Sequence, residues 1–159
     1  MDTRRFAMIF GIVFLLVGIL GFVPGVNHMH HGDPQTEHLS VGGPGHGDLL
    51  GLFHVNVLHN GVHLLFGVMG LVMSRTLGAA RSYFRIVGVA YLLLAVMGLI
   101  SAANMWNTFG LVPIHGNDVW LHAILGAAGI YFGFIKPGVV ETTDTYATGG
   151  TTGTPRAGV

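Results

Sequence analysis

The chain has 159 residues, of which 51% are hydrophobic and 9% are charged, and its formal net charge is zero. This composition is typical of a membrane protein, and the neutral balance excludes the electrostatic footprint of a nucleic-acid-binding protein. Cysteine is absent, which excludes disulfide bonds, thiolate metal ligands and thiol redox catalysis within the chain.

Four apolar runs follow one another along the sequence. They span residues 6–23, 49–73, 84–103 and 118–135. Each is close to the roughly 20 residues that a helix needs to cross the hydrocarbon core of a bilayer, and each is too long for a buried strand. The sequence therefore predicts an all-α fold, a four-transmembrane-helix bundle that occupies residues 1–137.

The connecting segments differ in charge on the two sides of this bundle. The Lys and Arg residues precede the first run, surround the connection between the second and third runs, or follow the fourth run. Because cytoplasmic loops retain positive charge, both termini are expected in the cytoplasm. The outer loop at residues 24–47 is rich in histidine, whereas the tail at residues 138–159 is rich in threonine and glycine. We expect the tail to be disordered.

The two halves of the bundle resemble each other in sequence. The first and third runs align without gaps as FGIVFLLVGILGFVPG (10–25) and VGVAYLLLAVMGLISA (87–102). The second and fourth runs align as HNGVHLLFGVMG (59–70) and DVWLHAILGAAG (118–129), with one histidine matched in each. Because both halves would start on the cytoplasmic side, this internal repeat predicts two pseudo-symmetric parallel helical hairpins.

Glycine residues recur on single faces of the second and fourth runs. They are Gly67 and Gly70 in the second run, and Gly126, Gly129 and Gly133 in the fourth. Helices in lipid associate through close backbone approach at small residues. We therefore expect these two faces to meet in the centre of the bundle.

Polar residues in the second and fourth runs predict a metal site. Those of the second run share one helical face and comprise Asn56, His59, Asn60 and His63. The fourth run carries Asp118 and His122 one turn apart. Imidazole and carboxylate groups from facing helices bind divalent zinc, manganese, iron or nickel in helical bundles. The predicted metal ligands are His59, His63, Asp118 and His122.

Two further hypotheses extend this site. Side-chain amides can fix the tautomers of metal-binding imidazoles, and the candidate cofactor-binding residues of this kind are Asn56, Asn60, Asn104 and Asn117. Haem is a variant with His63 and His122 as axial ligands. It ranks below a bare metal ion, because the outer connections contain no Lys or Arg to bind the propionates.

Other interpretations account for the same polar residues. Asn and His side chains also join membrane helices by interhelical hydrogen bonds, worth about 0.6 to 2 kcal/mol each. The protein would then be a non-catalytic accessory or assembly subunit of a larger membrane complex, or a homo-oligomer. A small-ligand site or a proton pathway is a third interpretation. The sequence leaves these alternatives open, and it does not decide whether the protein is an enzyme.

Three stretches carry a resemblance to a known family: LFHVNVLHNGVHLLFGVMGL (52–71), ARSYFRIVGVAYLLLAVMGLI (80–100) and FGLVPIHGNDVWLHAILGAAG (109–129). Over residues 4–135 the chain resembles the small bacterial membrane proteins of domain-of-unknown-function family 4383. The resemblance implies a four-helix integral membrane fold in the bacterial cytoplasmic (inner) membrane, and it implies no activity. The polar positions that match the family are His59, Asn60, His63, Asp118 and His122.

Overall fold

A computed structural model describes residues 2–28, 47–100, 108–109, 111–114 and 116–137. Within these ranges the chain is mostly helical, and three short strands lie between the first two helices. The helices are α1 (Thr3–Leu20), α2 (Val57–Met73), α3 (Leu77–Leu99) and α4 (Asn117–Ile130), which η2 (Tyr131–Ile135) continues as a π-helical turn. The strands are β1 (Asn27–His28), β2 (Gly47–Leu49) and β3 (Phe53–Val55).

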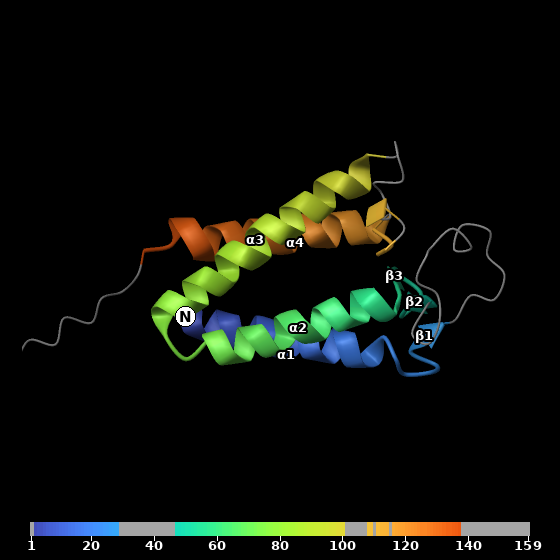
Figure 1. The fold of residues 1–159 in the computed structure, drawn as a ribbon, viewed down its shortest axis with the longest axis horizontal. Coiled ribbons are helices and arrows are strands. Elements are labelled where there is room, and N and C mark those ends of the chain that lie inside the picture. Colours follow the sequence, from blue (N-terminus) through green and yellow to red (C-terminus); the bar gives the residue numbers. More distant parts are fainter. Residues whose placement is uncertain (1, 29–46, 101–107, 110, 115, 138–159) are drawn as a thin grey trace, which may run out of the picture.

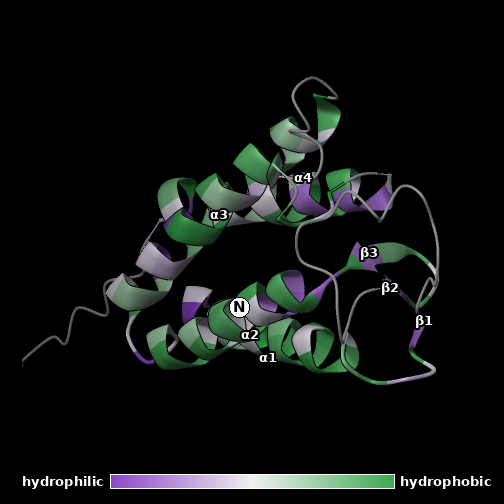
Figure 2. Ribbon diagram, turned by 45° about the vertical axis from the view of Figure 1, so that its right-hand side comes forward, coloured by the Kyte–Doolittle hydropathy of each residue, from purple (hydrophilic) through white to green (hydrophobic). Residues whose placement is uncertain are grey.

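The helices form two antiparallel hairpins, in which α1 packs on α2 and α3 packs on α4 (Figure 1). The start of α1, the turn between α2 and α3 and the end of η2 lie at one end of the molecule, and the strands lie at the other (Figure 1). Toward the strand end, α3 leans away from α2 in both ribbon views (Figures 1 and 2). The α3 helix thus diverges from α2 toward the end where the polar residues of α2 and α4 begin.

The second helix starts later than the apolar run predicts. Residues 49–56 were expected to be helical, but α2 begins at Val57. The preceding residues form β2 and β3, which join β1 in an antiparallel sheet of order β1-β2-β3. Leu50 and Gly51 take positive φ angles of 56° and 68° between β2 and β3, a backbone conformation that turns the chain and suits glycine. The fold is thus helical with a small sheet at one end.

Polar caps place the starts of α1 and α3 before the predicted apolar runs. The Asp2 side chain accepts a hydrogen bond from the Arg4 backbone N–H at 3.4 Å. The Thr76 hydroxyl accepts one from the Ala79 backbone N–H at 3.2 Å. Capping oxygens satisfy N–H groups that the first turn of a helix leaves free. Each helix therefore begins at a capping residue whose position hydrophobicity alone does not reveal.

Three helical segments are long and apolar enough to cross a membrane: α1, α3, and α4 together with η2. The remaining helix, α2, has 17 residues. At 1.5 Å per residue it is about 25 Å long, which is shorter than the roughly 30 Å hydrocarbon core. Large apolar side chains are exposed on all four helices, and hydrophobic residues dominate these helices in Figure 2. Such a surface is suited to lipid.

Glycine permits close packing inside each hairpin. A Cβ atom added to Gly70 of α2 would lie 2.7 Å from the Gly11 Cα atom of α1. A Cβ atom added to Gly129 of α4 would lie 2.5 Å from the Gly88 Cα atom of α3. The expectation that the glycine faces of the second and fourth helices meet each other is therefore wrong. Each face packs on the preceding helix instead, because consecutive helices joined by a connection are spatial neighbours.

Aromatic side chains hold the two hairpins together near the turn end. The Phe84 ring of α3 lies 5.2 Å from the Phe10 ring of α1 and 5.0 Å from the Phe132 ring of η2, measured between centroids. Phe84 is fully buried, as are Tyr83 and Val87 beside it. Such ring pairs add about 0.5–1.5 kcal/mol beyond the burial of their area. This core joins the hairpins near the turn end, whereas β3 and the start of α4 are joined by hydrogen bonds at the other end.

Replacing Gly70 by alanine should destabilise the fold by about 1–3 kcal/mol, the usual cost of overpacking a close contact. The added methyl group would meet the Gly11 Cα atom and the Ala7 carbonyl oxygen, which belong to the backbone and cannot rotate away. Gly61→Ala is the matched control, since an added Cβ there meets no described atom within 4 Å. Thermal unfolding in detergent measures both. Equal melting temperatures for the two variants would contradict glycine-dependent packing.

Candidate functional site

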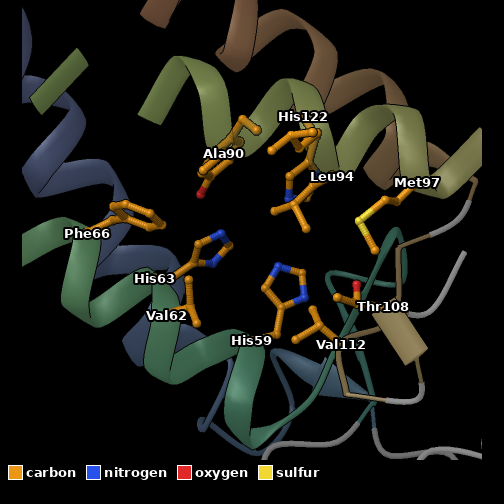
Figure 3. Close-up of a pocket in the computed structure, with 12 residues that line it drawn as sticks. His59, Val62, His63, Phe66, Ala90, Leu94, Met97, Thr108, Val112 and His122 are labelled. Atoms are coloured by element: carbon orange, nitrogen blue, oxygen red, sulfur yellow. The ribbon is translucent and has the colours of Figure 1, made fainter. Parts of the chain in front are cut away.

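Three buried histidines converge between the hairpins. His59 and His63 project from α2 into a cavity, and His122 reaches it from α4 (Figure 3). The ring centroids of His59 and His63 are 4.7 Å apart, and those of His59 and His122 are 6.0 Å apart. All three residues are at most 7% exposed. The structure therefore brings together the three imidazoles that the sequence placed on the polar faces of two helices.

Aromatic rings support two of these imidazoles. Phe14 of α1 stacks on His63, with ring centroids 5.6 Å apart and an interplanar angle of 6°. Tyr91 of α3 stacks on His122 at 4.8 Å and 24°. Phe14 and Tyr91 also stack on each other, at 5.5 Å and 18°. The four rings form a ring row, His63–Phe14–Tyr91–His122, to which each helix contributes one ring.

The hydrogen bond of His122 defines the chemistry of its ring. The Nδ1 atom lies 2.6 Å from the Asp118 carbonyl oxygen, one turn earlier in α4. A carbonyl oxygen can only accept, so Nδ1 carries the hydrogen and donates. In the neutral imidazole, Nε2 then carries a lone pair. His122 therefore offers an acceptor on the edge of the ring that points away from the α4 backbone.

Several polar atoms beside the histidines are left without an internal partner. Among the described residues, His63 Nδ1 and Thr108 Oγ1 are buried and make no hydrogen bond, and His59 Nδ1 makes none of standard geometry, although the His54 backbone interacts with its ring. All three residues line the same cavity. A buried polar atom without a partner costs about 1–3 kcal/mol. Such atoms are rare in stable proteins; these three border this cavity, whereas others among the described residues, such as Tyr83 Oη and Arg81 Nε, lie elsewhere.

The Asp118 carboxylate, a predicted metal ligand, is engaged by the backbone of the sheet. Its Oδ2 atom accepts a hydrogen bond from the His54 N–H of β3 at 3.2 Å, and Asp118 is 2% exposed. It lines a smaller cavity of about 100 Å³ that the three histidines also border. The carboxylate thus links α4 to β3, while the imidazoles face both cavities.

The four predicted cofactor-binding asparagines have different surroundings. Asn56 accepts from the His59 N–H at 2.8 Å and donates from Nδ2 to the Leu111 carbonyl oxygen at 2.7 Å. Asn60 is buried and packs on α1, where an added Cβ at Gly21 would overlap its amide. Asn117 is exposed and donates to the Leu52 carbonyl oxygen at 3.4 Å. Asn104 lies outside the described residues. The bond of Asn56 is to the backbone of His59 and leaves the imidazole of that residue to the cavity.

A complete metal coordination sphere is not present. Within the described ranges, no group of three or more His, Cys, Asp or Glu residues is arranged to hold a metal ion. The three imidazoles approach one another, but the fourth predicted ligand is bonded to β3. Residues 29–46, which contain most of the histidines of the outer loop, lie outside the described part of the chain.

The cavity beside the histidines has a volume of about 390 Å³. Its walls come from α2, α3 and α4, together with Thr108 and Val112 (Figure 3). Apolar side chains form most of the lining, including Val62, Phe66, Ala90, Leu94 and Met97. Leu93 also lines it and is 58% exposed. The cavity therefore reaches the outer apolar surface of the helices beside α3.

Sequence reasoning missed the partners of the histidines. Phe14 and Tyr91 are apolar-run residues that a hydrophobicity pattern assigns to general packing. The gap-free alignment of 10–25 with 87–102 places these two aromatics at equivalent positions, which was the available signal. Thr108 carried no comparable signal, because its position depends on how the connection folds against the cavity.

A model of the family described as Domain of unknown function (DUF4383) matches residues 4–135 of this chain. The match covers all four helices and the residues of the site. The chain belongs to this family. Comparisons with curated proteins and with solved structures find no match. Membership in the DUF4383 family carries no assigned activity, so a function for this member has to be argued from its site.

Replacing Asn56 by alanine should destabilise the protein by about 1–3 kcal/mol, because it removes a helix cap and leaves buried groups unpaired. Both amide atoms of Asn56 are used, one at the start of α2 and one on Leu111. Asn117→Ala is the control, since its side chain is exposed and its hydrogen bond is long, at 3.4 Å. Chemical unfolding in detergent measures the difference. An equally large loss of unfolding free energy in Asn117→Ala would contradict the role of Asn56 as a buried helix cap.

Proposed function

We propose that this protein binds a small, largely apolar molecule that enters the histidine-lined cavity from the lipid bilayer. The observation that carries the proposal is the set of buried polar atoms without partners on His59, His63 and Thr108. A ligand with polar atoms at that place would satisfy them. The gain is large because unsatisfied polar groups away from water are costly.

The size and lining of the cavity support this proposal. Small-molecule sites commonly have volumes of about 300–1,000 Å³ and apolar walls with a few polar groups that orient the ligand. The cavity has about 390 Å³ and combines apolar walls with three histidines and two hydroxyl-bearing residues, Tyr91 and Thr108. Exposed Leu93 at its rim gives access from the apolar surface of α3. A ligand dissolved in the membrane can enter there without crossing water.

The proposal includes a four-pass arrangement in the bacterial cytoplasmic membrane, with both termini in the cytoplasm. The described Lys and Arg residues lie near the starts of α1 and α3, in the turn between α2 and α3, and directly after η2. These positions share one end of the molecule (Figure 1). Their clustering supports the orientation, because positive charge is retained on the cytoplasmic side.

We also infer that the hairpins are two copies of one unit, arranged in parallel about an axis along the membrane normal. Equivalent residues in the alignment make equivalent contacts: Gly11 with Gly70 and Gly88 with Gly129, and Phe14 with His63 and Tyr91 with His122. These contacts support duplication of packing as well as of sequence. On this proposal, the ligand cavity formed at the junction of two related halves.

Filling the cavity should abolish ligand binding. Ala90 lines the cavity and is half-buried, so Ala90→Phe puts a ring where the ligand would lie. Val89→Phe is the matched control on the exposed face of the same helix. Protein purified in mild detergent is extracted with organic solvent, and the extract is analysed by mass spectrometry. We expect one non-bulk molecule at near-equimolar amount in wild type and Val89→Phe, and its loss in Ala90→Phe. Extracts that do not differ would contradict the proposal.

A bound divalent metal is the second candidate function. Imidazoles that bind metals commonly donate their other N–H to a backbone carbonyl or carboxylate, and His122 donates from Nδ1 to the Asp118 carbonyl oxygen. The unpartnered Nδ1 atoms of His59 and His63 are further possible ligands. Zinc, manganese, iron and nickel fit such nitrogen ligands, and haem remains the lesser variant of this proposal.

Elemental analysis of the purified protein tests the second candidate. A metal site predicts close to one ion per chain in wild type and its loss in His63→Ala, because one of three ligands is removed. Metal-free wild-type protein would contradict the metal proposal and leave the apolar ligand as the remaining site function. Metal-free, ligand-free protein that migrates with a larger complex would favour the accessory-subunit alternative.

A further inference from the structure

We infer that the ligand of the histidine-lined cavity presents a hydroxyl group on an aromatic ring, as a membrane-soluble phenol does, and that this hydroxyl donates a hydrogen bond to Nε2 of His122. The inference rests on the proposed ligand-binding function. It adds which partner donates the hydrogen bond, and it adds the shape of the ligand. Both follow from contacts that the protein makes with itself.

The direction of the hydrogen bond between ligand and protein follows from the bond that His122 makes with its own helix. Its Nδ1–H donates to the Asp118 carbonyl oxygen at 2.6 Å, so the neutral ring has only Nε2 left, and Nε2 accepts. The ring is 3% exposed and stacked on Tyr91, which holds it in this orientation. A ligand carbonyl or ether oxygen would place two acceptors against each other at Nε2. A ligand hydroxyl satisfies the nitrogen.

The shape follows from the walls of the cavity. Phe66 and Tyr91 both line it, with ring centroids 5.9 Å apart and an interplanar angle of 67°. Because Tyr91 is stacked between Phe14 and His122, it meets the cavity with its edge. Aromatic walls of this kind favour a planar guest, which gains ring contacts in addition to area burial. Leu94 and Met97 lie farther along α3 as flexible alkyl and thioether surface (Figure 3). A ring near His122 with an alkyl chain directed along α3 would cover both kinds of surface.

The remaining polar atoms are compatible with this ligand. The Thr108 hydroxyl can donate or accept, so it does not distinguish a phenol from another polar group. His59 and His63 each keep an unpartnered Nδ1 atom on the cavity side of α2. Either imidazole tautomer is allowed for these two histidines, and a second polar substituent on the ligand ring could hydrogen-bond to one of them. The ligand class is therefore decided at His122, whose tautomer is fixed.

The test compares a phenol with its methyl ether. Para-octylphenol and para-octylanisole have nearly the same shape, but only the phenol can donate. Calorimetric titration of the full chain in lipid nanodiscs, with empty nanodiscs subtracted, gives both affinities. One neutral hydrogen bond corresponds to about a fivefold preference for the phenol. Equal affinity for both compounds would overturn this inference while leaving the proposed apolar site in place; binding of neither would overturn both.

Variants identify the acceptor. His122→Phe keeps a ring for the stack on Tyr91 but removes Nε2. The affinity for para-octylphenol should therefore fall to that for para-octylanisole, and the affinity for para-octylanisole should stay unchanged. His54→Phe is the control, because the His54 ring pairs with Asp48 at 3.2 Å outside the cavity lining, and it should keep the preference. A preference retained in His122→Phe would overturn the assignment.

A measurement on the wild type keeps the inference testable if His122→Phe does not fold. In protein labelled with isotopic nitrogen in histidine, the acceptor nitrogen of His122 should shift when para-octylphenol is added and stay in place with para-octylanisole. A shift of the same size with both compounds would show that the hydroxyl is not recognised there.

Discussion

Close approach of helix backbones at glycine is the constraint on which the site depends. Because Gly70 and Gly129 carry no side chain, α1 and α3 come near enough for an aromatic ring of each to lie against a histidine of the next helix. The four rings then stack into one row through the centre. That row supports two imidazoles by their faces, while Nδ1 of His122 is held by the Asp118 carbonyl oxygen and Nδ1 of His63 has no hydrogen-bond partner.

The buried polar groups divide into two kinds. Asn56 and Asp118 are satisfied by backbone groups, Asn56 at the start of α2 and Asp118 on β3. These bonds tie the sheet to the helices and complete the scaffold. His59 and His63, by contrast, each keep a nitrogen without a partner next to an empty apolar volume. Since a fold gains nothing from such atoms on their own, their position supports the proposed ligand site over a set of interhelical bonds.

Periodicity in the sequence was sufficient to predict the helices and the convergence of His59, His63 and His122, because apolar length and helical spacing are local properties. It misplaced the start of α2, since Leu49, Leu52, Phe53 and Val55 continue the apolar run of the helix, whereas turn conformations such as that of Gly51 interrupt it. The helix that packs on each glycine face could not be predicted from periodicity, because the choice of neighbouring helix is a non-local property. The cavity could not be predicted, because its lining combines side chains of α2, α3 and α4 with Thr108 and Val112, which come together only in the folded chain.

On the proposed function, the exposed position of Leu93 at the rim of the cavity affects which concentration of ligand sets the fraction of protein with ligand bound. A compound that arrives through the hydrocarbon phase is concentrated there by partitioning before it meets the protein. Saturation would then track the mole fraction of that compound among the surrounding lipids, whatever its aqueous concentration. Even a modest intrinsic affinity would suffice for such a protein to respond to changes in the composition of the membrane that contains it.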